Sequence, residues 1–163
     1  MINDTISFGG HDPCQIANEF IQMGIDREEP ITPLEVQKLI YFAHGWTLAN
    51  HNRPLHHDEW EAWPYGPVLS VVYHRLSYYR GDPVDDIILA HDMRFEDYER
   101  RIIDDVYDGY RHMGGVRLSR LTHVKGGPWD QVKKKRWGSR IIPNETIRKY
   151  FIRVSRKIEA MNG

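Results

Sequence analysis

The chain contains 163 residues, of which 40% are hydrophobic, 12% aromatic and 28% charged, and its formal net charge at pH 7 is −1. This length suits one domain over residues 1–163, and five tryptophans with nine tyrosines exclude a disordered or low-complexity chain, because such side chains need burial. No apolar run approaches the roughly 18 residues that span a bilayer, and no secretory signal pattern opens the chain. A lone cysteine suits a reducing compartment. We therefore expect a cytoplasmic protein without membrane contact.

Two helix starts are apparent near the N-terminus. Asp12 followed by Pro13 predicts a first helix that ends at Gly24. The clearer start is residues 31–36, where a threonine cap precedes a proline and then a glutamate three residues after the cap, the pattern of a capping box. The apolar residues that follow predict a second helix, which ends near residues 50–52 because short polar side chains favour a turn there.

The pattern changes at residues 60–65, which read Trp-Glu-Ala-Trp-Pro-Tyr. Aromatic residues and a proline at this density predict an extended segment, and hence a small β element near residues 58–66. Gly66–Pro67 is expected to open a third helix that ends at Gly81. Residues 84–89 fit either a short strand or an apolar loop, and residues 92–112 predict a fourth helix.

The last third of the chain contains two further helix patterns. Gly114–Gly115 is expected to end the fourth helix, after which Ser119 caps a short helix that the Gly-Gly-Pro run at residues 126–128 must break. The chain is therefore predicted to be mainly α, a single compact helical domain of about five to six helices with a small β element. Asn144 is expected to cap a last helix whose inward face carries Ile147, Phe151, Val154 and Ile158.

Candidate metal-binding and catalytic residues are few. The densest histidine group lies in residues 51–58, but the neighbours His56 and His57 point apart on any regular element and no zinc-binding spacing occurs, so we expect a polar loop and no metal. Ser119 and His123 are four residues apart and are a candidate Ser–His dyad, yet no nucleophile-elbow motif surrounds the serine. A capping serine and a half-buried histidine explain both residues, so we expect no catalytic residue, no cofactor and no enzyme.

Opposite charges gather in two parts of the chain. Residues 1–110 carry 8 Lys or Arg against 20 Asp or Glu, whereas residues 111–163 carry 14 against 3. Either the basic part covers the acidic part of the same fold, or each part faces a partner of its own. The basic third, with Trp129 and Trp137 available to stack on bases, fits a nucleic-acid-binding surface, although its last helix equally matches a solvated amphipathic helix.

Aromatic residues are numerous for a core of this size. Tryptophan and tyrosine are the preferred anchors of protein interfaces, but tryptophan is also often only partly buried in an ordinary core. The sequence leaves both interpretations open for the following side chains: Trp60, Trp63, Tyr65, Tyr73, Tyr78, Tyr79, Trp129 and Trp137.

Three segments, taken in order, resemble a known family. The first is residues 32–45, which contain the pattern L-x-V-x-K-L-x-Y; the second is residues 60–68, which contain Y-G-P-V; the third is residues 118–129, which contain L-S-x-L-T-H and then P-W. Together they resemble the Panacea domain, the SocA-like antitoxin or phage-associated GepA-type family, over residues 13–137. Residues 138–163 form a C-terminal basic helix outside the strongest match.

The resemblance implies an antitoxin of a bacterial or prophage toxin–antitoxin module that is not an enzyme and whose partner is a cognate toxin protein. It implies neutralisation through protein–protein binding, either directly or as an adaptor that delivers the toxin to a Clp-type protease. The alternative function is a nucleic-acid-binding regulator that uses the basic C-terminal third.

The shared motifs supply the candidate partner-binding residues. Residues 65–68 are expected to form a rigid corner, because Gly66 allows a close approach and Pro67 starts a helix. Lys38, Tyr41 and His44 share one side of the second helix and are expected beside this corner. Each candidate either contacts a partner or holds the fold together. The full set is Lys38, Tyr41, His44, Trp63, Tyr65, Gly66, Pro67, Val68, Ser119, Thr122, His123, Pro128 and Trp129.

Overall fold

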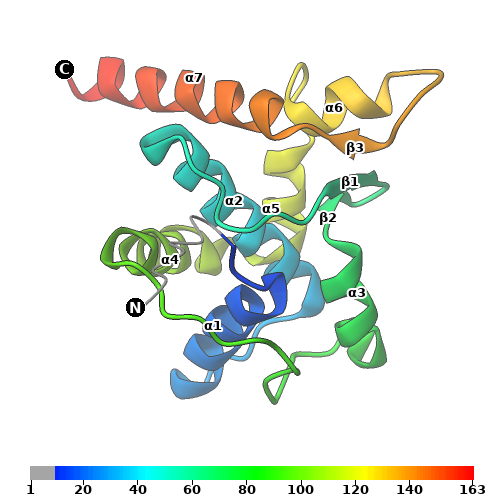
Figure 1. Cartoon of the computed structure of the whole chain (residues 1–163), viewed down its shortest axis with the longest axis vertical. Helices are drawn as coiled ribbons and strands as arrows, with labels where there is room; N and C mark the ends of the chain where they lie inside the picture. The colour runs from blue at the N-terminus through cyan, green and yellow to red at the C-terminus, as the bar shows by residue number, and fades with distance from the viewer. Residues whose placement is uncertain (1–9) are drawn as a thin grey trace, which may run out of the picture.

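The computed structural model describes residues 10–163, in which helices surround a central helix and a small sheet lies at one side (Figure 1). The mainly α fold with a small β element is confirmed, and none of the described helices is long and apolar enough to cross a membrane. The elements are α1 (Pro13–Asp26), α2 (Pro33–His51), β1 (Trp60–Trp63), β2 (Gly66–Val68), α3 (Ser70–Leu76), the 3-10 helix η1 (Ser77–Tyr79), α4 (Asp97–Tyr110), the 3-10 helix η2 (Arg111–Met113), α5 (Gly114–Thr122), α6 (Pro128–Lys133), β3 (Ile141–Ile142) and α7 (Asn144–Asn162).

Helix α2 is the centre of the fold. Twelve of its 19 residues are buried, and it packs against α1, α4, α5 and α7. A helix that is covered on most of its faces belongs in a core and not at a surface. Its start confirms the predicted capping box, because the Thr32 hydroxyl accepts from the Glu35 N–H while the Glu35 carboxylate accepts from the Thr32 N–H. It ends before Asn52, whose left-handed backbone (φ 53°) suits the end of a helix.

Helix α1 also begins where the sequence predicts. The Asp12 carboxylate accepts from the Cys14 N–H at 2.9 Å, and Pro13 is the first helical residue. The helix runs two residues past the expected end at Gly24. Cys14 is fully buried, and burial together with nearby Asp12 raises the pKa of its thiol to about 11. The cysteine is therefore a packed core residue and not a reactive thiolate.

The sheet corrects the expected start of the third helix. Its strand order is β2-β1-β3, all antiparallel, and Trp63 pairs with Gly66 across a turn formed by Pro64 and Tyr65. Gly66–Pro67 is therefore strand, and α3 begins only at Ser70. The backbone of Gly66, at φ +116°, is incompatible with a helix and suits the tight turn into β2.

Several expected boundaries in the second half of the chain are also wrong. Helix α4 begins at Asp97 rather than Asp92, because Glu96 forms a capping box with Glu99. Gly114 starts α5 instead of ending the preceding helix, which places Ser119 inside α5 and not at its cap. Residues 84–89 form a loop, and the short helix α6 has no counterpart in the prediction.

Helix α7 confirms the expected helix and two of its inward residues. Ile147 and Phe151 are buried and Val154 is half-buried, but Ile158 is 47% exposed because the last turns extend past the neighbouring helices. Asn144 is the first residue of this helix, yet its side chain makes a hydrogen bond with the His44 ring at 2.9 Å and does not cap the helix end.

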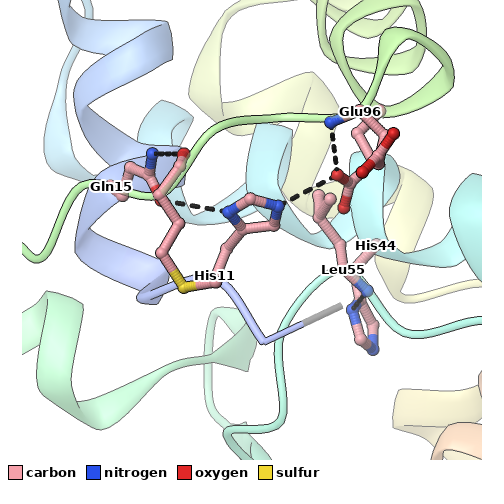
Figure 2. Close-up of polar contacts among 7 residues, drawn as sticks. His11, Gln15, His44, Leu55 and Glu96 are labelled. Atoms are coloured by element: carbon pink, nitrogen blue, oxygen red, sulfur yellow. Dashed lines mark hydrogen bonds and ion pairs between the residues drawn. The ribbon is translucent and has the colours of Figure 1, made fainter. Parts of the chain in front are cut away.

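A polar network joins the start of α1 to the start of α4 (Figure 2). The His11 ring lies 3.0 Å from the Glu99 carboxylate and 3.1 Å from the Gln15 side-chain carbonyl, and the same carboxylate accepts from the Glu96 N–H at 2.8 Å. Burial lowers the pKa of His11, but the hydrogen bond and charge of Glu99 outweigh it and the net pKa is raised. The pair is buried and stabilises the packing of α1 on α4.

The crossing of α2 and α7 depends on a glycine. A Cβ at Gly45 would lie 2.3 Å from the Phe151 ring, and this ring packs edge-on against Tyr41 and Trp46 at centroid distances of 5.8 and 5.0 Å. Any side chain at position 45 would therefore displace Phe151 from the core.

We expect Gly45→Ala to lower the free energy of unfolding by about 2 kcal/mol, because overpacking against a buried ring outweighs the gain in helix propensity. Gly109→Ala is the matched control: it lies within α4, where an added Cβ meets nothing within 4 Å, so it should stabilise the protein by about 1 kcal/mol. Urea denaturation of both variants measures the difference, and a Gly45→Ala protein as stable as the wild type would contradict this account of the crossing.

Candidate functional site

The family motifs converge on one hairpin turn, residues 63–67, between β1 and β2. Four of its backbone carbonyl groups face side chains from other elements. The Trp129 indole N–H donates to the Trp63 carbonyl at 2.7 Å, and the Ser119 hydroxyl donates to the Tyr65 carbonyl at 2.6 Å. The remaining two contacts are a 3.2 Å contact between the His123 ring and the Pro64 carbonyl, and a 2.9 Å hydrogen bond from the Lys38 ammonium to the Pro67 carbonyl.

These side chains come from α2 and from the consecutive helices α5 and α6, all of them distant in sequence from the turn. Lys38 lies on α2, Ser119 lies on α5 with His123 directly after it, and Trp129 lies on α6. The Lys38–Pro67 hydrogen bond is buried and the Trp129–Trp63 hydrogen bond is partly buried, whereas the Ser119 and His123 contacts lie at the surface. The side chains therefore hold the turn in one conformation.

Lys38 is the most unusual of these four side chains because it is fully buried. Burial lowers the pKa of its ammonium group to about 7, since no carboxylate lies close enough to offset the loss of water. The neighbouring Gln37 side chain donates to the Leu69 carbonyl and accepts from the Leu69 N–H, both at 3.0 Å. Together these two residues cover the outer edge of β2 and the start of α3.

Gly66 allows this close packing. A Cβ at this position would lie 2.6 Å from the Thr122 hydroxyl and 3.0 Å from the Lys38 side chain, and its φ of +116° disfavours any other residue. Thr122 is buried and donates to the Ser119 carbonyl at 2.6 Å. The expected rigid corner therefore exists, although its second residue is strand and not helix.

The structure does not form the candidate Ser–His dyad. The Ser119 hydroxyl donates to the Tyr65 carbonyl, while the His123 ring contacts the Ser119 backbone carbonyl and packs at a tilt against Trp129 with ring centroids 3.8 Å apart. Pro128, the first residue of α6, directs Trp129 toward the turn. Ser119 and His123 thus position the turn and do not act on each other.

Tyr41 and His44 lie away from the turn, contrary to expectation. Tyr41 packs edge-on against Trp60 at 5.2 Å. His44 accepts from the Leu55 N–H at 3.3 Å (Figure 2). Its ring stacks on that of His56 with centroids 4.2 Å apart. Burial lowers the pKa of His44 to about 4 and that of His56 well below its usual value. Both histidines are therefore neutral core residues.

The histidine-rich segment does not assemble a ligand set. His56 is buried, while His57 and Asp58 face a different side of the loop near α1. Within residues 10–163, no three His, Cys, Asp or Glu side chains are grouped closely enough to hold a metal ion.

An apolar groove of about 400 Å³ opens beside the hairpin turn. One wall is the turn itself, and the others are the start of α2 and the outer face of α3. Tyr65 and Tyr73 are 73% and 45% exposed at its rim, where Tyr73 packs against Trp63 with ring centroids 4.8 Å apart. The lining residues are Pro33, Leu34, Gln37, Trp63, Pro64, Tyr65, Val68, Tyr73, Leu76 and Arg80.

Sequence reasoning missed part of this groove. Pro33, Leu34 and Leu76 were predicted only as helix residues, and Arg80 carried no signal because its place at the rim depends on the turn after η1. Gln37 lies inside the first family segment, residues 32–45. Its polar side chain on an otherwise apolar helix is the signal that could have identified it as a site residue.

The fold and the groove define a small helical domain that presents a rigid, mostly apolar surface. The family model for "Antitoxin SocA-like, Panacea domain" matches residues 36–130, a range that contains all thirteen candidate residues. The chain is also 33% identical over 131 residues to Antitoxin SocA from Caulobacter vibrioides (strain NA1000 / CB15N), covering 74% of this chain and 70% of that protein. No solved structure matches the chain.

The chain therefore belongs to the SocA-like antitoxin family with a Panacea domain. Membership supports an antitoxin role, indicates a toxin as partner in general terms, and suggests a regulator that is not an enzyme.

We expect the buried Lys38 to make stability depend on pH. Its pKa is about 7 in the folded chain and about 10.5 when unfolded, so the unfolded chain holds more protons between these values and stability rises with pH. From pH 7.5 to 9.5 the free energy of unfolding should rise by about 2–3 kcal/mol more in the wild type than in Lys38→Met.

Lys125→Met is the control, because Lys125 is exposed and should keep the wild-type pH dependence. Urea denaturation at a series of pH values provides the measurement. If the free energy of unfolding rose equally with pH in the wild type and in Lys38→Met, burial would not lower the pKa of the Lys38 ammonium in the folded chain.

Proposed function

We propose that this protein is an antitoxin that neutralises a cognate toxin protein by binding it directly through the apolar groove beside the hairpin turn. The observation that carries the proposal is the groove itself, which is open to solvent and lined mostly by apolar and aromatic side chains. All of its lining residues except Pro33 and Leu34 lie within the range matched by the antitoxin family model. The proposal involves no catalytic step and no cofactor.

The groove has the features of a binding hot spot. Partly exposed aromatic side chains at the centre of an apolar surface contribute most to protein–protein affinity. Tyr65 projects from a turn whose carbonyls are held by four side chains, and Tyr73 is braced by Trp63. A surface held in one conformation loses little entropy when it binds, which favours affinity.

The chemistry of the lining indicates the matching segment of the toxin. Arg80 is the one charged residue among the lining side chains, and the rest of the wall is apolar apart from Gln37. A segment that places one or two large apolar side chains in the groove and a carboxylate near Arg80 would complement it. The thirteen motif residues then fall into three groups. Trp63, Tyr65 and Val68 line the groove, whereas Tyr41 and His44 pack in the core away from it. The remaining eight form or contact the hairpin turn and hold it in shape.

The proposal places toxin and antitoxin together in the bacterial cytoplasm, where a toxin acts on the cell that makes it. It also leaves a second route to neutralisation, in which the bound toxin is delivered to a Clp-type protease. The two routes differ in one respect: occlusion requires a stable complex, whereas delivery requires an active protease.

The test is co-expression of the tagged protein with the product of the adjacent gene, scored by growth and by size-exclusion chromatography. We expect Tyr65→Glu and Tyr73→Glu to lose rescue and to weaken binding by at least about 30-fold, because each buries a charge in an apolar contact. Tyr78→Glu is the matched control, since Tyr78 is 89% exposed and does not line the groove.

Circular dichroism should show that all three variants keep the helical fold. Full rescue by both groove variants would contradict the assignment of the groove. Rescue by the wild type without a co-eluting complex, lost in a protease-deficient strain, would favour delivery over occlusion. A neighbour that is harmless when expressed alone would remove the antitoxin proposal for this gene pair.

A further inference from the structure

The strong charge asymmetry of the chain is not cancelled by ion pairs within the fold. Six ion pairs join described side chains, and Arg111–Glu29 is the one among them that links the acidic residues before position 110 to the basic residues after it. Figure 1 shows α7 along the top of the molecule, whereas α1 and the segment that leads to α4 lie below α2. The basic side chains therefore face solvent at their own edge.

Helix α7 carries a continuous basic stripe. Lys149, Arg153, Arg156 and Lys157 are all exposed, and their spacing of four, three and one residues places them on one side of the helix. This side is opposite the buried Ile147 and Phe151. At 1.5 Å per residue the helix is about 28 Å long, and the stripe covers about 12 Å of it.

The loop between α6 and β3 extends the same edge. Lys134, Lys135, Arg136 and Arg140 are exposed there, and Trp137 is 83% exposed among them. The loop leads through β3 directly into α7, and α6 packs against α7. An exposed tryptophan surrounded by cations provides a flat ring for stacking next to charges that bind phosphate.

We propose that this edge, formed by α7 and residues 134–140, binds the phosphate backbone of a nucleic acid, as a partner separate from the toxin. The linear arrangement of cations matches an extended polyanion, whereas an interface with a folded protein would need an apolar centre. Between the cations of the stripe no large apolar side chain is exposed, because Ile158 and Met161 follow the spacing of the inward face.

The test uses the full chain and a fluorescein-labelled 24-base-pair DNA duplex, with the 24-nucleotide single strand as a second probe. We expect micromolar binding at 50 mM salt, with a log–log salt slope of about −4 to −5, as for about five phosphate contacts. Arg153→Gln with Arg156→Gln should weaken binding about fivefold or more and make the slope shallower by about 2.

Arg94→Gln with Arg101→Gln is the matched control, because it makes the same change in net charge at exposed arginines in the acidic part of the chain. It should change affinity less than twofold. If Trp137→Ala loses more affinity for the single strand than for the duplex, Trp137 stacks on unpaired bases. An equal loss of affinity for both probes would show that Trp137 contacts the backbone that they share and does not stack on unpaired bases.

Two results would overturn the proposal. One is the absence of salt-dependent binding by the wild type to either probe at 50 mM salt. The other is an equal effect of the two double variants, which would reflect net charge and not this edge. Rescue of growth from the toxin by the Arg153/Arg156 double variant is measured in parallel, and this rescue should persist. Loss of rescue with unchanged DNA affinity would show that the stripe binds the toxin and not DNA.

Discussion

The structure depends on one set of contacts: side chains from outside the small sheet meet four backbone carbonyls of its hairpin turn. Lys38, Ser119, His123 and Trp129 face these carbonyls, from three different parts of the chain. Each helix that contributes a donor is thereby tied to the turn. The close approach of these helices in turn requires Gly66, since a Cβ there would meet Thr122 and Lys38.

This arrangement separates the residues that build the groove from those that a partner would touch. The donors contact backbone carbonyls, which every residue supplies, so the turn keeps its conformation whatever side chain occupies its exposed position. Tyr65 presents its ring to solvent while its carbonyl is held from behind by Ser119. A turn with a fixed backbone and a variable exposed side chain suits a protein-binding domain. In a catalytic site the same polar side chains would have to face a substrate, and here they face backbone carbonyls.

The basic side chains gather on a surface separate from the groove. The groove lies beside α2 and α3, whereas the basic stripe lies on the outer side of α7 and in the loop before β3. Because these surfaces are formed by different elements, occupation of one does not bury the residues of the other. Exposed cations that are not paired with the acidic part of the fold also produce a field that acts beyond contact distance and weakens with salt.

The sequence by itself determined what short-range chemistry controls. The caps at Asp12 and Thr32, the extended segment at residues 60–63 and the last helix, α7, each depend on neighbours within a few residues, and the structure confirms them. The family motifs also lie together in the fold, because Lys38, Gly66, Ser119, His123 and Trp129 meet at one turn.

Only the tertiary structure decided what these residues do. Gly66–Pro67 can open a helix or a strand, and pairing with β1 together with the Lys38 hydrogen bond selects the strand. Asn144 is a residue type that often caps a helix, but its side chain forms a hydrogen bond with His44, one hundred residues away in sequence. Tyr41 shares a helix face with Lys38, yet its ring packs in the core against Trp60 and Phe151. Each of these outcomes is a competition between a local preference and a partner distant in sequence, and the distant partner prevails because an unsatisfied buried polar group or an unfilled core position costs more free energy than a local preference gains.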